Sequence, residues 1–146
     1  MENNKKAVDF VRAHENLRRE TYRCTGNKLT IGYGHTGRDV LEGMTITREQ
    51  AEELLREDMR EAVDAVDALI DAPLNENQRA ALISFAFNVG YGQFRDSTLR
   101  RVINADPNDR PRIEAQWRRW NKSQGKVTEG LINRREDELN LYFTKE

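Results

Sequence analysis

A stretch near the N-terminus decides the fold, and it reads HENLRRETYRC over residues 14–24 and TIGYGHTG over residues 30–37. Just before it, apolar residues recur at helical spacing and predict a helix from about Lys5 to Leu17. From Glu20 to Thr36, apolar residues alternate on both sides of Thr25-Gly26-Asn27. This alternation predicts strands joined by a tight turn, so we expect a small β-hairpin directly after the first helix.

The surest helix lies in the middle of the chain. Thr47-Arg48-Glu49-Gln50 has the capping-box arrangement, and apolar residues continue at three- and four-residue spacing to about Asp71. Ala72-Pro73 then ends the helix, because the residue before a proline is pushed out of the helical region. A helix of this length is suited to connecting two lobes.

The rest of the chain predicts more helices. Gln78 to Asn88 is mostly apolar and therefore buried, Gly90 ends it, and Gly90-Tyr91-Gly92 predicts a turn. Three more helical segments follow, Ser97 to Asn104, Pro111 to Trp120 and Leu131 to Phe143, and Trp117 and Trp120 are expected to face the core. The fold class is α+β and mainly α-helical, in a single domain with a hairpin lobe over about 1–46, a connecting helix over 47–71 and a helical lobe over 73–146.

Composition narrows the classes of function. The 146 residues are 37% hydrophobic and 34% charged with a net charge of −1, which is typical of a globular protein and offers no general attraction to nucleic acid. Acids dominate from Thr45 to Asp71, and bases modestly outweigh acids from Arg95 onward. These biases are read mainly as solvated helical surfaces, although the basic half could favour an anionic cell wall.

Cys24 is the only cysteine, so no internal disulfide is expected and folding needs no oxidising compartment. The first residues, Met-Glu-Asn-Asn-Lys-Lys, and the mixed stretch after them are too charged for a signal sequence or a membrane span. If the target lies outside the cytoplasm, another agent must open the way to it.

The quoted stretch resembles the start of the phage-type lysozymes, glycoside hydrolase family 24. That family carries a glutamate, eight residues, an aspartate or cysteine, five residues and a threonine, followed by Ile-Gly-x-Gly-His, and this spacing is kept at Glu15, Cys24 and Thr30. The resemblance extends over nearly the whole chain through Asn75-x-x-Gln78-x-x-Ala81-Leu82, Phe87-Asn88-x-Gly90, Phe94-x-x-Ser97-Thr98 and Gly130-Leu131-x-Asn133-Arg134-Arg135.

The resemblance implies a two-lobed lysozyme fold and hydrolysis of the β-1,4 bond between N-acetylmuramic acid and N-acetylglucosamine in peptidoglycan. Glu15 would be the general acid that protonates the leaving sugar oxygen. Cys24 would act across the sugar ring, and Thr30 would hold the attacking water beside it, so inversion is the favoured outcome. An unperturbed cysteine titrates at about 8.5, so a working thiolate needs a neighbouring cation or dipole. Arg23 and Lys28 are near in sequence.

Each of these residues also has a plainer interpretation. Most free cysteines are small hydrophobic residues, and Cys24 could be one beneath the hairpin. Thr30 could be an ordinary β-branched strand residue.

Supporting roles are implied for residues outside the catalytic spacing. The resemblance predicts an ion pair between His35 and Asp58 that ties the hairpin to the connecting helix, and it implies that Arg134 reaches back to the catalytic glutamate. Two histidines without clustered Cys or Asp ligands make a poor metal site, so no metal is expected. His14 is interpreted as structural, because successive helix residues point about 100° apart. Arg135 and Arg101 are expected at the surface.

Thr36, Phe87, Asn88 and Ser97 align with family positions that line a sugar-binding cleft. Phe87 fits a core position equally well. The implied partner is peptidoglycan, reached from the host cytoplasm through a holin-type pore, with no cofactor, no nucleic acid and no stable membrane insertion, and a monomer is expected. The alternatives are a lytic transglycosylase, a catalytically inactive peptidoglycan-binding module and, least supported, an acidic helix scaffold for protein partners.

Overall fold

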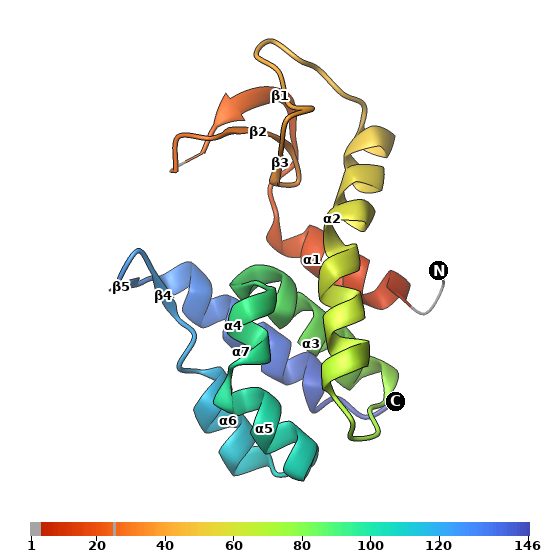
Figure 1. Cartoon of the computed structure of the whole chain (residues 1–146), viewed down its shortest axis with the longest axis vertical. Helices are drawn as coiled ribbons and strands as arrows, with labels where there is room; N and C mark the ends of the chain where they lie inside the picture. Colours follow the sequence, from red (N-terminus) through yellow and green to blue (C-terminus); the bar gives the residue numbers. More distant parts are fainter. Residues whose placement is uncertain (1–3, 25) are drawn as a thin grey trace. The chain divides into compact units, whose positions relative to one another are not determined.

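The computed structural model describes residues 4–24 and 26–146. Contacts divide the chain into two compact units, one of them Val8–Arg60 and the other Met1–Ala7 with Glu61–Glu146. The element order is α1, β1–β3, α2–α6, β4–β5 and α7 (Figure 1). The mainly helical α+β class predicted from the sequence is therefore confirmed.

The Val8–Arg60 unit is built on a small antiparallel sheet. β1 (Arg18–Arg23) pairs with β2 (Leu29–Gly32), which pairs with β3 (His35–Thr36). The expected hairpin is therefore present and carries a third, two-residue strand. The described part of its turn includes Asn27, whose φ of 60° is the left-handed conformation that tight turns need, whereas Thr25 lies outside the described residues.

Helices begin and end close to their sequence signals. α1 (Lys5–His14) is shorter than expected, and Glu15 lies directly after it. α2 (Arg48–Leu69) starts at the predicted capping box, in which the Gln50 backbone N–H donates to Thr47 Oγ1 and the Thr47 N–H donates to Gln50 Oε1. At its other end, Asn104 Oδ1 accepts the Asp71 N–H, so this backbone donor just past the helix has a hydrogen-bond partner.

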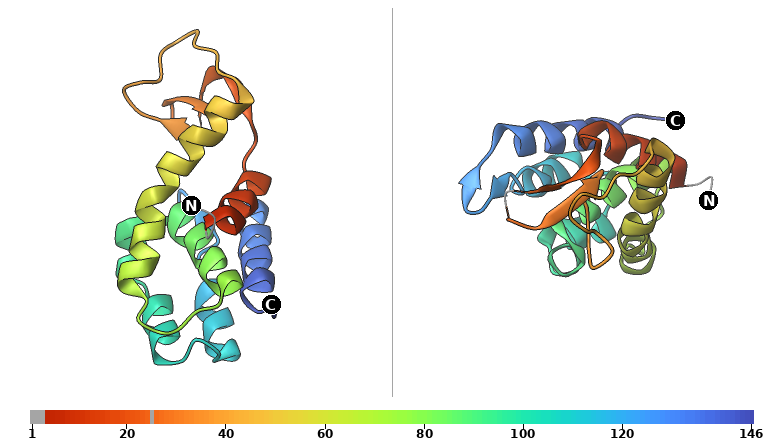
Figure 2. Two further views of the ribbon diagram at one scale, coloured as in Figure 1. Left: turned by 90° about the vertical axis from the view of Figure 1, so that its right-hand side faces the viewer. Right: turned by 90° about the horizontal axis from the view of Figure 1, so that it is seen from above.

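The larger unit packs helices around α3 (Glu76–Val89), which lies against α7 (Glu129–Tyr142) (Figure 2). An edge-to-face aromatic cluster fills its core, with Phe85 of α3 in contact with Phe94, Trp117 and Trp120. Trp117 is fully buried, and Trp120 is half-buried three residues past the end of the helix Arg110–Trp117, so both side chains face the core as expected although the helix is shorter than predicted.

The predicted turn at Gly90-Tyr91-Gly92 is wrong. α3 ends at Val89, Gly90 follows with a φ of 97°, and α4 (Tyr91–Arg95) begins at the next residue. The Phe94 N–H donates to Gly90 O and the Phe94 side chain is fully buried, so core packing continues the chain as a helix where local sequence indicates a turn.

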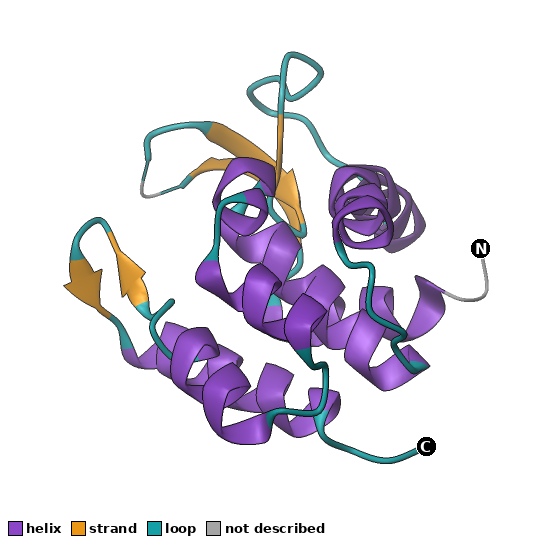
Figure 3. Cartoon of the chain, turned by 60° about the horizontal axis from the view of Figure 1, so that its bottom comes forward, coloured by secondary structure: helices purple, strands orange, loops and turns teal. Residues whose placement is uncertain are grey.

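The C-terminal part contains the two helices predicted over Ser97 to Asn104 and Pro111 to Trp120, and it adds a hairpin that the sequence pattern did not indicate. Ser97 caps α5 (Thr98–Ala105), and Asp109 caps α6 (Arg110–Trp117). Figure 3 shows the hairpin of β4 (Lys122–Ser123) and β5 (Lys126–Val127) between α6 and α7. Its turn residues Gln124 and Gly125 both have positive φ, which matches the twist of a tight hairpin.

Candidate active site

Glu15 stands where the chain leaves α1 for the sheet. Its backbone N–H donates to Arg12 O at 3.3 Å, and the residue is half-buried. Because α1 ends at His14, the backbone at Glu15 is no longer helical and the chain can turn here toward β1. The structure therefore places Glu15 at the junction between a helix and a strand.

Cys24 lies at the end of β1, where the backbone begins its turn. Its N–H donates to Lys28 O at 3.0 Å, and its carbonyl accepts the Asn27 N–H at 2.8 Å. The Lys28 backbone N–H, then the Thr30 hydroxyl and then the Gly26 N–H hydrogen-bond the sulfur and lower the pKa of Cys24 below that of an ordinary thiol. Cys24 is partly exposed, so the interpretation as a small hydrophobic residue beneath the hairpin is not supported.

The pKa of Cys24 is lowered by hydrogen-bond dipoles and not by the side-chain charges of Arg23 and Lys28, which are near in sequence. Lys28 contributes its backbone N–H. Arg23 is directed elsewhere, because its guanidinium donates to Asn27 O at 3.1 Å and to Glu42 Oε1 at 3.1 Å. A thiolate at this position is thus stabilised by groups that the turn itself holds in place.

Thr30 is brought next to Cys24 by the register of the hairpin. It pairs with Tyr22 across β1 and β2 and is only 2% exposed. Its Oγ1 lies 2.9 Å from Lys28 O, and the hydroxyl can turn its single proton from that carbonyl to the Cys24 sulfur. Thr36 stands opposite Thr30 on β3 and is exposed.

His35 joins the sheet to α2. Its Nδ1 lies 2.8 Å from Asp58 Oδ2, so the predicted ion pair is present. The other ring nitrogen contacts a second carboxylate that the sequence analysis did not anticipate. His35 Nε2 lies 3.0 Å from Asp39 Oδ1, in the turn after β3. The only sequence signal for Asp39 is its spacing of four residues from His35, which is common among surface residues. His14 packs its ring against Phe10 at 4.8 Å between centroids, in keeping with the structural role expected for it.

The three positions in the larger unit that the resemblance assigns to sugar binding differ in exposure. Asn88 is exposed near the end of α3, and Phe87 is half-buried. Ser97 is buried, and its hydroxyl both donates to Phe94 O at 2.8 Å and accepts the Arg100 N–H at 3.1 Å. These two bonds occupy the Ser97 hydroxyl in capping α5.

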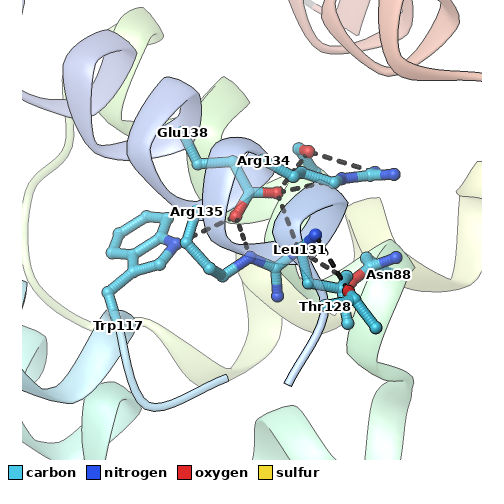
Figure 4. Close-up of polar contacts among 8 residues, drawn as sticks. Asn88, Trp117, Thr128, Leu131, Arg134, Arg135 and Glu138 are labelled. Carbon is cyan, nitrogen blue, oxygen red and sulfur yellow. Dashed lines mark hydrogen bonds and ion pairs between the residues drawn. The ribbon is translucent and has the colours of Figure 1, made fainter. Parts of the chain in front are cut away.

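A buried polar cluster on α7 is the largest feature that sequence reasoning missed (Figure 4). Glu138 is 0% exposed, accepts the Ser84 hydroxyl at 2.6 Å and accepts the Trp117 Nε1–H at 2.9 Å. Arg134 Nε lies 3.4 Å from Glu138 Oε2, and Arg135 Nε lies 3.0 Å from Glu138 Oε1. The carboxylate therefore organises both arginines.

The expected surface position of Arg135 is wrong. Its side chain is 1% exposed, and burial lowers its pKa from the ordinary value while the charge of Glu138 acts in the opposite direction. The guanidinium lies over the Phe85 ring, 5.2 Å from the centroid, and Nη2 donates to Asn88 Oδ1 at 2.7 Å. Arg101 is exposed, as expected.

The profile of the family described as Phage lysozyme matches residues 12–138. The chain belongs to the phage lysozyme family. It is 42% identical over 141 residues to an endolysin of Bacillus phage B103, a match covering 95% of this chain and 53% of that protein. It is 37% identical to an endolysin of Acyrthosiphon pisum secondary endosymbiont phage 1, covering 94% of each. The chain thus spans about half the length of the Bacillus phage relative and nearly all of the other.

Solved phage lysozymes share the fold. The endolysin from Escherichia coli O157:H7 phage FAHEc1 superposes with a TM-score of 0.88 at 34% identity, covering 98% of this chain and 94% of that one. The lysozyme-like fold expected from the resemblance is therefore confirmed.

In the part of the chain that the structure describes, no helix is both long and apolar enough to cross a membrane. Residues 4–24 and 26–146 also contain no group of three His, Cys, Asp or Glu side chains arranged to hold a metal ion.

Proposed function

We propose that this phage lysozyme hydrolyses the β-1,4 bond between N-acetylmuramic acid and N-acetylglucosamine in bacterial peptidoglycan. The observation that carries the proposal is the hairpin that brings Thr30 beside the partly exposed Cys24, at the family spacing behind Glu15. A glycosidase needs an acid for the leaving oxygen and a second group on the opposite face of the ring, and these residues supply both. Family membership supports the same activity.

In the proposed reaction, Glu15 protonates the glycosidic oxygen as its bond to the anomeric carbon breaks. A water molecule held by the Thr30 hydroxyl attacks that carbon from the other side, and its proton passes to the Cys24 thiolate. The anomeric configuration inverts. The lowered pKa of Cys24 supports this role, because a thiolate is required before the water can lose its proton.

The remaining residues have supporting roles in the proposal. Thr36, Phe87 and Asn88 contact the sugar chain, and Ser97 contributes by holding the start of α5 as well as by the implied sugar contact. His35 and Asp58 hold the sheet on α2, and Arg134 tunes the acid–base chemistry from α7. The chain acts as a single lysozyme domain and as a monomer, without a cofactor.

The substrate sets the place of action in this proposal. The chain is made in the host cytoplasm, reaches the wall through a holin-type pore and causes lysis there. It has no nucleic-acid partner and does not insert stably into the membrane.

The direct test is lysis of purified cell walls by the wild type and by Glu15→Gln. Removal of a general acid should lower the rate by about 100-fold or more. Glu57→Gln is the matched control, because Glu57 is exposed on α2 and should keep full activity. Equal inactivity of the wild type and Glu15→Gln would instead indicate a peptidoglycan-binding module.

The products separate hydrolysis from its alternatives. Mass spectrometry of the released fragments should show free reducing ends, whereas 1,6-anhydro ends would identify a lytic transglycosylase. Proton NMR of the first-formed anomer should show the α configuration expected for inversion at a β bond.

A further inference from the structure

The contact between Arg135 and Asn88 fixes which way the Asn88 amide faces. Arg135 Nη2 donates to Asn88 Oδ1 at 2.7 Å. An arginine has no acceptor, so the amide oxygen must be the atom that faces it. The Asn88 Nδ2 group, with its two N–H donors, is therefore turned away from Arg135 at an exposed position on α3.

Arg135 is itself held firmly from the other side. Its Nε lies 3.0 Å from Glu138 Oε1, and that carboxylate is anchored by Ser84 at 2.6 Å and Trp117 at 2.9 Å. Figure 4 shows Arg135 lying between Glu138 and Asn88. This side chain is 1% exposed and its guanidinium is packed over the Phe85 ring, which restricts its rotation.

We propose that Arg135 is a positioning residue that locks Asn88 as a hydrogen-bond donor toward the acetamido carbonyl of an N-acetylated sugar. The proposal rests on the function proposed above and names the group that the sugar must present. An acetamido carbonyl oxygen only accepts, so it matches a locked donor. An N-deacetylated sugar presents an ammonium group, which only donates and therefore meets a donor.

The test compares two substrates prepared from one batch of wall. Walls are N-deacetylated, and a portion is re-acetylated with acetic anhydride as the matched substrate. The wild type should show an apparent KM for deacetylated walls about tenfold above that for re-acetylated walls, because a site built around one polar group rejects an analogue that leaves it unpaired.

Asn88→Asp isolates the donor without disturbing the fold. An aspartate still accepts from Arg135, so the melting temperature should not fall, but it presents only acceptors to the substrate. We expect the KM for re-acetylated walls to rise about five- to tenfold with kcat within about twofold, and the preference for acetylated walls to be lost. Asn140→Asp, at an exposed position on α7, is the charge-matched control and should leave both KM values unchanged.

Arg135→Gln tests whether the arginine acts through Asn88. A glutamine both donates and accepts, so it permits either orientation of the Asn88 amide. We expect KM to rise in the wild-type background and to rise no further in an Asn88→Ala background, with folding checked by circular dichroism.

Two results would overturn the proposal. One is an unchanged substrate preference in Asn88→Asp, and the other is an equal effect of Arg135→Gln in both backgrounds. A wild type that lyses no walls at all would instead refute the proposed function, so the two failures are distinguishable.

Discussion

The Nδ1 atom of His35 lies 2.8 Å from the Oδ2 atom of Asp58, joining β3 to α2 within one unit. Burial lowers the pKa of His35, but hydrogen bonds to Asp58 and Asp39 outweigh it, so the pKa is raised above the ordinary histidine value. Burial also raises the pKa of Asp58, against the lowering effect of His35. Burial therefore disfavours the charged form of Asp58, and the His35 imidazolium offsets part of this effect.

Replacing His35 by asparagine should lower the free energy of unfolding in a pH-dependent way. Because the folded-state pKa is raised, the stabilisation is complete below the unfolded value of about 6.5 and is lost as the pH rises through the folded value. We expect a loss of about 1–2 kcal/mol at pH near 5.5 that shrinks toward zero at alkaline pH. Urea unfolding across this range measures it.

Asp39→Asn is the matched comparison for His35→Asn, because Asp39 is exposed and its ion pair should contribute less than about 1 kcal/mol. A stability difference between the wild type and His35→Asn that stays constant with pH would contradict the ion-pair account.

Cys24→Asp and Cys24→Ser should differ sharply in wall lysis. An aspartate ionises well below neutral pH, so Cys24→Asp should stay active and the acid limb of its pH–activity profile should move to lower pH. A serine hydroxyl does not ionise in this range, and activity should fall by about tenfold or more. Full activity of Cys24→Ser with an unchanged pH profile would remove the thiolate from the mechanism.

Thr30→Val should raise the pKa of Cys24, because it removes the hydroxyl that hydrogen-bonds the sulfur while keeping the shape of the side chain. The rate of iodoacetamide alkylation of Cys24 against pH reports this pKa directly, and its midpoint should move upward. Wall lysis near neutral pH should fall by about tenfold. Thr30→Ser retains a hydroxyl and should restore both properties; identical alkylation profiles in all three proteins would argue against the contact.

Glu138→Gln should strongly destabilise the fold, by about 3–5 kcal/mol, because it leaves the buried Arg135 without its compensating charge. Glu136→Gln is the control on the same helix, since the ion pair of Glu136 with Arg118 is exposed and should contribute less than about 1 kcal/mol. Thermal and urea unfolding of the two variants give the comparison. Equal losses would mean that burial of the Glu138 pair has little energetic consequence.

Local sequence was sufficient for most of the helices. The capping box at Thr47 and Gln50 and the proline after Ala72 act within a few residues, so they set the ends of α2 to within two residues of the prediction. Cys24 and Thr30 also come together through a short hairpin, and their contact follows from its register.

Tertiary structure decided what depends on distant partners. Arg135 reads as a surface residue because nothing beside it in sequence shows that Asn88, 47 residues away, accepts its hydrogen bond. The segment after Gly90 similarly forms α4 and not the predicted turn, because the Phe94 ring packs in the core.

The sequence by itself determined the helices, the hairpin and the spacing of Glu15, Cys24 and Thr30, because these depend on backbone preferences and short-range hydrogen bonds. Only the tertiary structure decided the environments of ionisable groups whose partners lie far along the chain, such as Glu138 with Trp117 and Ser84. Charge interactions depend on distance and burial, and both are settled when segments far apart in the chain pack together.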